Sequence, residues 1–250
     1  MATLLAVVVS APVEAVAGSG APDPVKAVQK QLRHGHGVRL SELSVGIFGA
    51  DHSPLDRMHA QVQLSPRGPV AYDASWYSMP RPGADPREVD ERAAFAGMDW
   101  DDVTYVGGVR YLHYEAGVLP GAKSWVREAP SRTWAQDFTD QPVDLFDAKM
   151  LRGLLRGVTG KAVPGGYVYR GAATLEQVGY SSRFRPKDKI DWWLWTDAQG
   201  LPTRLRTRDV SGSGYERLGA IFDTRYRDWG FPLVVTAPAA DQVIDEDDVR

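Results

Sequence analysis

The sequence predicts a mainly β protein of α+β character, in which about eleven strands, mostly joined by short turns, accompany two helices. Three observations favour this fold class. After the first helix, apolar residues alternate with polar ones, which is the period of a half-buried strand. The chain is rich in the turn formers glycine (25) and proline (17). It also carries 8 tryptophans, and many turns joining aromatic strands suit this composition better than a helical bundle does.

The 250 residues and formal net charge of -3 suit one domain, which we place at residues 23–250. Slight acidity argues against a nucleic-acid partner, because such proteins usually show a basic footprint. The chain has no cysteine, which excludes disulfides, zinc-thiolate sites, a thiol nucleophile and a lipid-modified N-terminal cysteine.

Residues 1–22 predict a signal-like apolar leader and a linker. Thr3 to Ala11 is an apolar run, and Ala15-Val16-Ala17 matches a small-x-small cleavage site. No Lys or Arg precedes the run, so the true start lies upstream, or the signal is degenerate, or the segment is an apolar extension. The run is shorter than the roughly 20 residues that span a bilayer. We therefore expect a secreted or cell-envelope protein.

The first predicted helix covers Asp23 to His34, with Asp23 as its cap and Pro24 in its first turn. Strand periodicity follows in Arg57–Ser65 and in the return strand Val70–Trp76, around a Pro-Arg-Gly-Pro turn. The proline-rich stretch Met79–Glu91 predicts a loop.

A hairpin is predicted over Val103–Tyr114 around two glycines, and a short strand over Lys123–Glu128. Between Gln141 and Val158 the apolar residues fall at three- and four-residue spacing, which predicts an amphipathic helix opened by Asp140 and Pro142. The remaining strands are predicted at Gly166–Thr174, Lys189–Thr196, Leu201–Arg208, Arg217–Arg227 and Phe231–Thr236.

Known catalytic and phosphate-binding motifs fail on inspection. The stretch from Gly157 to Lys161 lacks the first glycine and the Ser or Thr of a phosphate loop. The segment around Ser213 lacks the glycine of a nucleophile elbow, so a flexible turn is the better interpretation. The histidines at 34, 36 and 52 and the closing acidic run lack a metal-ligand pattern. We predict no enzyme activity, no cofactor and no metal, with an unrecognised enzyme kept as a third hypothesis.

The stretch Ile190–Asp209, IDWWLWTDAQGLPTRLRTRD, raises the question of why one strand carries indoles on both faces. Trp192 points one way, while Trp193 and Trp195 point the other. Burying one Trp removes on the order of 200 Å² from water, so both faces should have cover. A strongly curved sheet around helices would cover the inner face, and a loop such as Pro80–Arg92 or a partner the outer face. The alternative is that two tryptophans are partly exposed without function.

The C-terminal sequence resembles the LolA/LppX-like carrier superfamily, and is most similar to its actinobacterial LppX and LprG lipoproteins. The resemblance rests on WTDAQGLPTRLRT, IFDTRYRDWGFPLVV and TAPAADQVID, over about the last 60 residues. The matching positions are Trp195, Asp197, Gly200, Pro202, Arg204, Tyr226, Trp229, Gly230, Pro238, Asp241 and Val243. It implies a half-barrel, a single curved antiparallel sheet of about eleven strands wrapped around helices. The lipobox cysteine of that branch is absent, which favours a soluble secreted form over an acylated one.

The leading hypothesis is extracytoplasmic binding or transport of a lipid or another apolar molecule in the cavity between sheet and helices. We expect a monomer whose further partner is the outer membrane surface or an envelope protein. For each lining position alone, plain core remains the alternative. The predicted lining is Met58, Val62, Leu64, Tyr72, Trp76, Trp192, Leu194, Leu205 and Phe222 on the sheet, and Met150, Leu151, Leu154 and Leu155 on the helix.

A second hypothesis is a cell-envelope sensor or protein-interaction module of the same fold with no transported ligand. Its surface would combine Trp193 and Trp195 with Arg204, Arg206 and Arg208. The plain alternative is a solvated outer face. A ligand volume inside the sheet would favour the carrier, and a filled core with an exposed aromatic–arginine patch would favour the module.

Overall fold

The structure is a computed structural model and describes residues 20–78, 102–130, 137–174, 176–177, 189–211 and 218–249. The leader up to residue 19 and the predicted loop over Met79–Glu91 lie outside these ranges, as does the Pro80–Arg92 cover. The helices are α1 (Pro24–Gln31) and α3 (Ala148–Leu155), and single 3-10 turns lie at Pro120–Ala122, Ala240–Gln242 and Glu246–Asp248.

The strands fall into two groups along the chain. The first group is β1 (His36–Phe48), β2 (Asp51–Ser65), β3 (Gly68–Ser78), β4 (Asp102–Val106), β5 (Val109–His113) and β6 (Trp125–Arg127). The second is β7 (Lys161–Val163), β8 (Gly166–Thr174), β9 (Lys189–Asp197), β10 (Pro202–Ser211), β11 (Leu218–Pro232) and β12 (Val243–Asp245).

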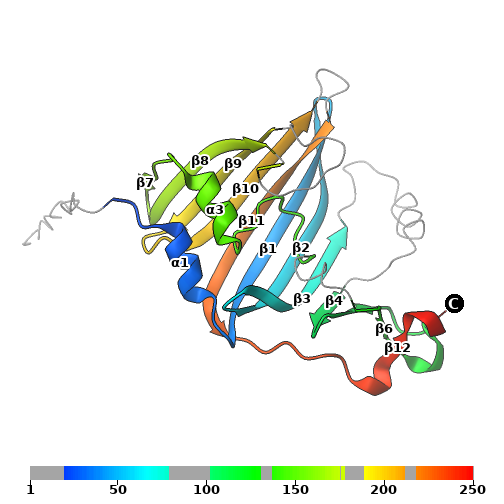
Figure 1. Ribbon diagram of the computed structural model, residues 1–250. Helices are drawn as coiled ribbons and strands as arrows, with labels where there is room; N and C mark the ends of the chain where they lie inside the picture. The colour runs from blue at the N-terminus through cyan, green and yellow to red at the C-terminus, as the bar shows by residue number, and fades with distance from the viewer. Residues whose placement is uncertain are drawn as a thin grey trace, which may run out of the picture.

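All twelve strands form one open, curved sheet in the order β12-β6-β5-β4-β3-β2-β1-β11-β10-β9-β8-β7 (Figure 1). Neighbours are antiparallel except β12 and β6, which are parallel. Two meanders, β1–β6 and β7–β11, meet where β1 pairs with β11. The predicted single, mainly antiparallel sheet is confirmed, with twelve strands rather than about eleven.

Most predicted strands coincide with observed ones, but three strands were not predicted and two were merged. The strands without a prediction are β1, β7 and β12. The segments predicted separately at Arg217–Arg227 and Phe231–Thr236 run together as β11, which ends at Pro232. Positive φ angles at Asp228 (54°) and Gly230 (81°) accompany a shift of the β1–β11 register, so the strand bends there without ending.

Helix α1 forms where it was predicted. The Asp23 Oδ1 atom accepts a hydrogen bond of 2.9 Å from the Val25 N–H, which satisfies a donor that the first helical turn leaves open. Pro24 occupies the first turn, where its missing N–H is harmless. The helix ends at Gln31, three residues before the predicted end.

The predicted helix over Gln141–Val158 is wrong in its first half, because α3 covers only Ala148–Leu155. Asp147, rather than Asp140, caps it, and its Oδ1 accepts from the N–H groups of Lys149 and Met150. The preceding residues 137–147, which we call the strap, are mostly irregular. Val143 and Phe146 fall at helical spacing with α3 only by coincidence, since they and Leu145 are buried in a non-helical segment.

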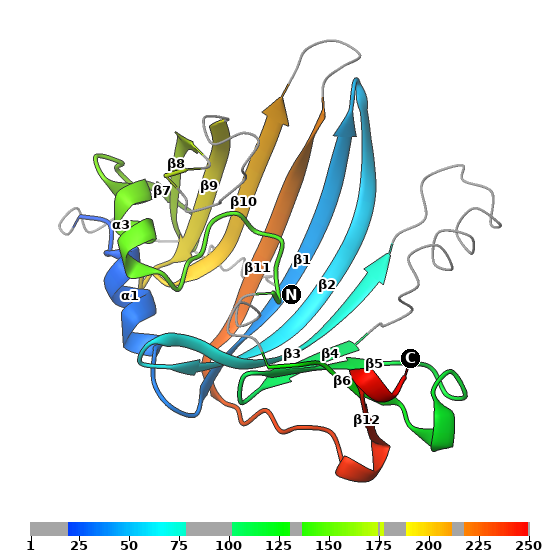
Figure 2. The same cartoon turned by 45° about the vertical axis from the view of Figure 1, so that its right-hand side comes forward.

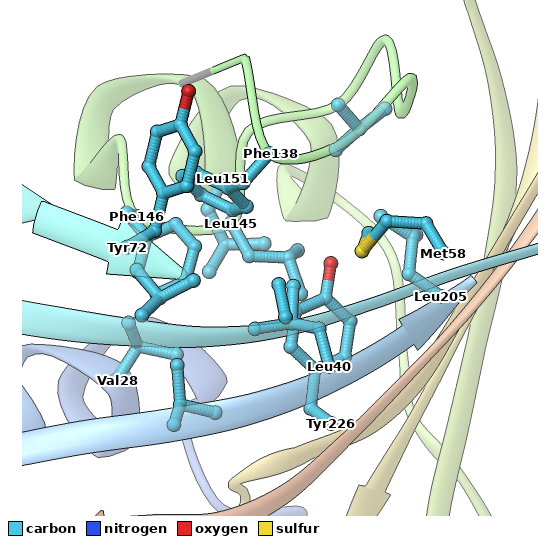
Figure 3. Close-up of a cluster of buried hydrophobic side chains, with 14 of the residues drawn as sticks. Val28, Leu40, Met58, Tyr72, Phe138, Leu145, Phe146, Leu151, Leu205 and Tyr226 are labelled. Carbon is cyan, nitrogen blue, oxygen red and sulfur yellow. The ribbon is translucent and has the colours of Figure 1, made fainter. Parts of the chain in front are cut away.

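The strap and both helices cover the concave face of the sheet (Figure 2). One apolar cluster fills the space between them, and Figure 3 shows strap side chains against those of the strands. The strap contributes Phe138, Leu145 and Phe146, and the Phe138 ring lies 5.5 Å from that of Tyr72 on β3. The concave face is therefore packed by the chain's own strap over much of its described extent.

Candidate functional site

The indoles of β9 alternate between the two faces of the sheet, as the sequence predicts. Trp192 is 2% exposed on the concave face, and its indole lies over Gly171 of β8, its cross-strand partner. A Cβ at Gly171 would meet the Trp192 ring at 2.7 Å, so glycine is what gives the indole its place. Trp193 and Trp195 lie half-buried on the convex face.

Arginines of β10 cover the convex-face tryptophans. The register places Arg204 opposite Trp195 and Arg206 opposite Trp193. The Arg204 guanidinium carbon lies 4.7 Å from the Trp195 ring centroid, and the Arg206 carbon lies 6.0 Å from the Trp193 centroid. These are cation–π distances, so guanidinium groups cover part of both indole rings, and the expected cover by a loop or a partner stays a prediction.

The arginines of this surface differ in their ion pairing. Arg204 makes a two-pronged ion pair with Asp223 of β11, which holds its plane over Trp195. Arg208 lies opposite Asp191 in the register, beside Arg206 at the next outward position. The predicted set of two tryptophans and three arginines therefore shares one face, and whether it binds a partner stays a prediction.

The predicted cavity-lining residues lie on the concave side, and they are either fully buried or half-buried. Met58, Val62, Leu64, Tyr72, Trp192, Leu194, Leu205 and Leu151 are at most 2% exposed and belong to one cluster. Trp76, Met150, Leu154 and Leu155 are half-buried against that cluster, whereas Phe222 is half-buried outside it. The predicted lining residues of the sheet, except Phe222, and those of α3 thus pack together in one apolar cluster.

Four strap residues that were not predicted as cavity lining occupy this space. Phe138, Val143, Leu145 and Phe146 lie among the predicted lining residues. The helical spacing marked Val143 and Phe146 as members of an apolar stripe, but an irregular segment has no apolar period, so no signal marked Phe138 and Leu145 as inward-facing. Because the buried lining residues touch the strap and one another, an apolar ligand reaches them only if the strap moves.

Polar groups anchor the strap to the inner face of the sheet. Glu42 of β1, 3% exposed, accepts hydrogen bonds at Oε2 from the hydroxyls of Thr139 (2.6 Å) and Thr224 (2.5 Å), and at Oε1 from the Asp140 N–H (2.9 Å). All three partners donate, which suits an ionised carboxylate.

A second anchor lies beside the first. The Gln141 amide nitrogen donates to the carbonyls of Leu205 and Phe222, 3.2 Å from each, and its oxygen accepts from the Thr207 hydroxyl at 2.9 Å. Gln141 therefore clips the strap to β10 and β11 at once.

Burial shifts the titration of the anchor carboxyls upward. Loss of solvent raises the pKa of Glu42 above its ordinary value, and its three hydrogen bonds oppose that rise. Burial also raises the pKa of Asp140, and the charge of Asp56 adds to the effect. Keeping Glu42 and Asp140 ionised in these positions therefore costs free energy, because a carboxylate is more stable in water.

A hollow of about 570 Å³ opens between α1, α3 and β8. Val25, Leu155, Val158 and the buried Tyr169 give it apolar walls, and Arg152 and Arg156 of the α3 end line it as well. Tyr169 donates a 2.9 Å hydrogen bond from its hydroxyl to the Pro22 carbonyl, which fixes the N-terminal wall. Of the predicted lining residues, Leu155 contributes to this hollow.

No helix among the described residues combines the length and the apolar character that a membrane span requires. The same ranges hold no group of three or more His, Asp or Glu that could hold a metal ion.

Comparisons with known proteins leave the family open. No family model matches the chain, and no curated protein matches its sequence. Among solved structures, a DUF1329 family protein from Desulfovibrio piger matches with 12% identity, a TM-score of 0.28 and coverage of 85% of this chain and 95% of that one. Transferrin Binding Protein B from Haemophilus parasuis matches with 6% identity, a TM-score of 0.22 and coverage of 84% and 29%. Likeness at this level carries no argument about fold or function.

Proposed function

We propose that this chain is an extracytoplasmic, non-enzymatic protein that binds or transports a lipid or another apolar molecule between its curved sheet and its helices. We further propose that it is a LolA/LppX-like carrier without an acylated cysteine. The observation that carries the proposal is the hollow of about 570 Å³ beside α3. Small-molecule sites commonly have volumes of about 300–1,000 Å³ and mainly apolar walls.

The packing of α3 supports a movable helix at this site. Only Leu151 of its residues is fully buried, whereas Met150, Leu154 and Leu155 remain half-buried. Completing the burial of a leucine stabilises by up to about 1.5–3 kcal/mol, and this helix leaves part of that burial unused. An apolar ligand in the hollow would supply the missing contacts.

The charges around the hollow favour an amphiphile with an anionic head group. Arg152 and Arg156 present guanidinium groups at the α3 end. The nearby Asp23 carboxylate already accepts from the Val25 and Lys26 N–H groups, so it competes little for them. An apolar tail would lie on Leu155 and Val158 with its head group near the arginines.

Entry of a longer tail would require the strap to lift. The buried lining of the sheet lies beneath Phe138, Leu145 and Phe146, which are part of the same cluster. Glu42 and Gln141 are the anchors that would have to release. Segment movements of this kind commonly gate buried sites.

The test uses the purified full chain, extraction with organic solvent, and mass spectrometry of the extract. A fluorescent fatty acid is then titrated into the wild type, into Leu155→Trp, which fills the hollow, and into Val234→Trp. Val234 is 73% exposed and does not line the hollow, so its variant adds the same indole elsewhere.

The proposal requires one probe per protein and at least tenfold weaker binding to Leu155→Trp, with Val234→Trp unchanged. An empty extract together with no probe binding to the wild type would refute it.

A second candidate is a cell-envelope sensor or protein-interaction module of the same fold. Two observations favour it: the concave face is packed by the strap, and Trp193 and Trp195 lie under arginines on the convex face. The double variant Trp193→Ala/Trp195→Ala should then abolish partner capture from envelope extracts while probe binding is unchanged.

A further inference from the structure

The convex face places arginines directly opposite one another on neighbouring strands. Arg39 of β1 is paired in register with Arg227 of β11, and Arg225 of β11 is paired with Arg204 of β10. Like charges in directly opposed positions destabilise a sheet. The central strand β11 therefore carries two such oppositions on a single face, and neither serves the packing of the core.

On β2, β1, β11 and β10, outward arginines outnumber outward aspartates, although the chain as a whole has a formal net charge of -3. Two aspartates of these strands face outward, and each forms an ion pair: Asp228 with Arg39 at 2.7 Å, and Asp223 with Arg204. The flanking strands add the carboxylates of Asp73 on β3 and Asp191 on β9 to this face. The other outward arginines make no ion pair with a described residue. These are Arg57, Arg206, Arg208, Arg225 and Arg227.

A hollow of about 530 Å³ opens in the middle of this face, across β3, β2, β1 and β11. One register row crosses it as Ser75, His59, Ser41 and Arg225. The two serines are short, so the surface is lower at their positions on either side of His59. Arg39 and Arg227 of the adjacent row line the same hollow.

The other side of the hollow carries uncharged donors and acceptors and a carboxylate. Gln61 of β2 and Asp73 of β3 line it. Asp73 accepts a 2.7 Å hydrogen bond from the Thr104 hydroxyl. Because Asp73 is exposed to solvent, its carboxylate can accept further hydrogen bonds from a ligand. The hollow thus has guanidinium groups on one side, and on the other side an amide and a carboxylate that can form hydrogen bonds with hydroxyl groups.

This combination favours one ligand chemistry over its rivals. Guanidinium groups bind carboxylates through paired hydrogen bonds, whereas Ser, Gln, His and Asp side chains exchange hydrogen bonds with hydroxyls. An acidic peptide supplies carboxylates with few hydroxyls, and an anionic bilayer would meet the Asp73 and Asp228 carboxylates. A sugar chain with carboxylate groups supplies both kinds of partner.

We propose that the convex hollow is a binding site for an acidic saccharide. Arg225 and Arg227 hold the carboxylate groups, and Ser41, His59, Gln61 and Asp73 bind the ring hydroxyls. This site lies on the opposite face of the sheet from the hollow beside α3, so it stands or falls independently of lipid binding.

The test is calorimetric titration of the full chain at low salt with a galacturonate hexasaccharide. The neutral maltohexaose, hexaglutamate and phosphatidylglycerol vesicles serve as the comparison probes. The variants are Arg225→Gln inside the hollow and Arg170→Gln, which removes the same charge from an exposed site on β8 outside it.

We expect the galacturonate to bind at least tenfold more tightly than maltohexaose. Arg225→Gln should weaken it about tenfold, Arg170→Gln by less than twofold, and added salt should weaken it further. Because Arg225→Gln relieves the opposition to Arg204, its melting temperature should stay equal or rise. Lost binding with undiminished stability then separates binding from unfolding.

Several outcomes would overturn the proposal. Equal affinity for maltohexaose would remove the role of charge, and equal loss in both arginine variants would remove the role of the hollow. Hexaglutamate binding as tightly as the saccharide would assign the site to acidic peptides, and binding to vesicles alone would assign the face to membranes.

Discussion

The Thr139 hydroxyl lies 2.6 Å from the Glu42 carboxylate, joining the strap to the central strand β1. This contact is partly buried, and the carboxylate also accepts from the Thr224 hydroxyl and the Asp140 N–H. A glutamate that the sheet buries therefore helps to hold the strap over the concave face, together with the Gln141 anchor.

Removing the acceptor should destabilise the fold, whereas neutralising it should not. Glu42→Leu leaves one buried and two partly buried donors without an acceptor, which should lower the free energy of unfolding by about 3 kcal/mol. Glu42→Gln keeps an acceptor for Asp140, and its amide can donate to the threonine hydroxyls. We expect it to be as stable as the wild type at neutral pH. Denaturant unfolding of both variants checks this, and equal losses would refute the anchor.

The same glutamate should make the protein more stable on mild acidification. Burial raises the pKa of Glu42, so the folded protein retains its proton to higher pH than the unfolded chain does. Its contribution is full below the unfolded pKa and is lost as pH rises through the folded pKa. Burial also raises the pKa values of Asp137 and Asp140, so these groups should add to the same loss of stability with rising pH.

Two variants separate these contributions by sign. Glu42→Gln should flatten the fall in stability between about pH 4.5 and neutrality. Arg127 lowers the pKa of Asp245, whose contribution is present above its ordinary pKa of 3.8 and is lost as pH falls below it. Asp245→Asn should therefore leave the fall between about pH 4.5 and neutrality unchanged and should lessen the loss of stability below about pH 4. Thermal melts from about pH 3 to neutrality test the pair. A flat wild-type profile would contradict the assignment.

Two glycine-to-alanine changes should have opposite effects. A Cβ at Gly171 would meet the buried Trp192 ring at 2.7 Å, so Gly171→Ala should destabilise by about 1–3 kcal/mol. Gly153 lies in α3 with nothing within 4 Å of its added Cβ, so Gly153→Ala should stabilise by about 0.5–1 kcal/mol. Denaturation midpoints give both signs, and Trp emission reports whether the indole of Trp192 shifts.

The cap of α3 should control the helix locally. Asp147→Ala leaves the N–H groups of Lys149 and Met150 without their acceptor and should cost about 1 kcal/mol. Asp23→Ala removes the equivalent cap from α1 and serves as the matched control. Hydrogen exchange should accelerate in α3 for the first variant and in α1 for the second. Exchange that changed equally in both helices would argue against separate movement of α3.

The cation–π pair on the convex face should be measurable by a double-mutant cycle. Arg204→Met and Trp195→Ala each remove one partner of the 4.7 Å contact. We expect a coupling of about 0.5–1 kcal/mol, since the pair is partly exposed. Arg206 and Trp193, 6.0 Å apart, should couple less and provide the comparison. Equal coupling free energies for the two pairs would show that the distance from guanidinium to ring does not determine the strength of the interaction.

Strand period allowed much of the sheet to be predicted, and its failures have physical causes. The inward face of β1 carries Glu42 and Ser44, which are buried to hold the strap, so its apolar alternation is interrupted and no strand was predicted there. In the strap, Val143 and Phe146 fall at a helical interval, yet Gln141 binds two strand carbonyls and the Phe146 N–H binds the Asp144 side chain. Side-chain hydrogen bonds outcompeted the helix.

The tryptophan surface of β9 and the convex hollow were predictable to different degrees. The period of the strand predicted that Trp192 lies on the opposite face from Trp193 and Trp195. The convex hollow could not be foreseen, because it depends on how four strands are aligned across distant parts of the chain. His59 and Ser41 become neighbours only through the β1–β2 register.

The seam between β1 and β11 also constrains the order in which the protein can fold during synthesis. His36 pairs with Pro232 and Phe48 with Leu218, so these partners are separated by most of the chain. Until the ribosome has produced β11, β1 has one strand partner and one open edge, and pairings of such long range close slowly. For a chain exported as proposed above, this delay would keep the polypeptide unfolded long enough to be threaded through a translocation channel.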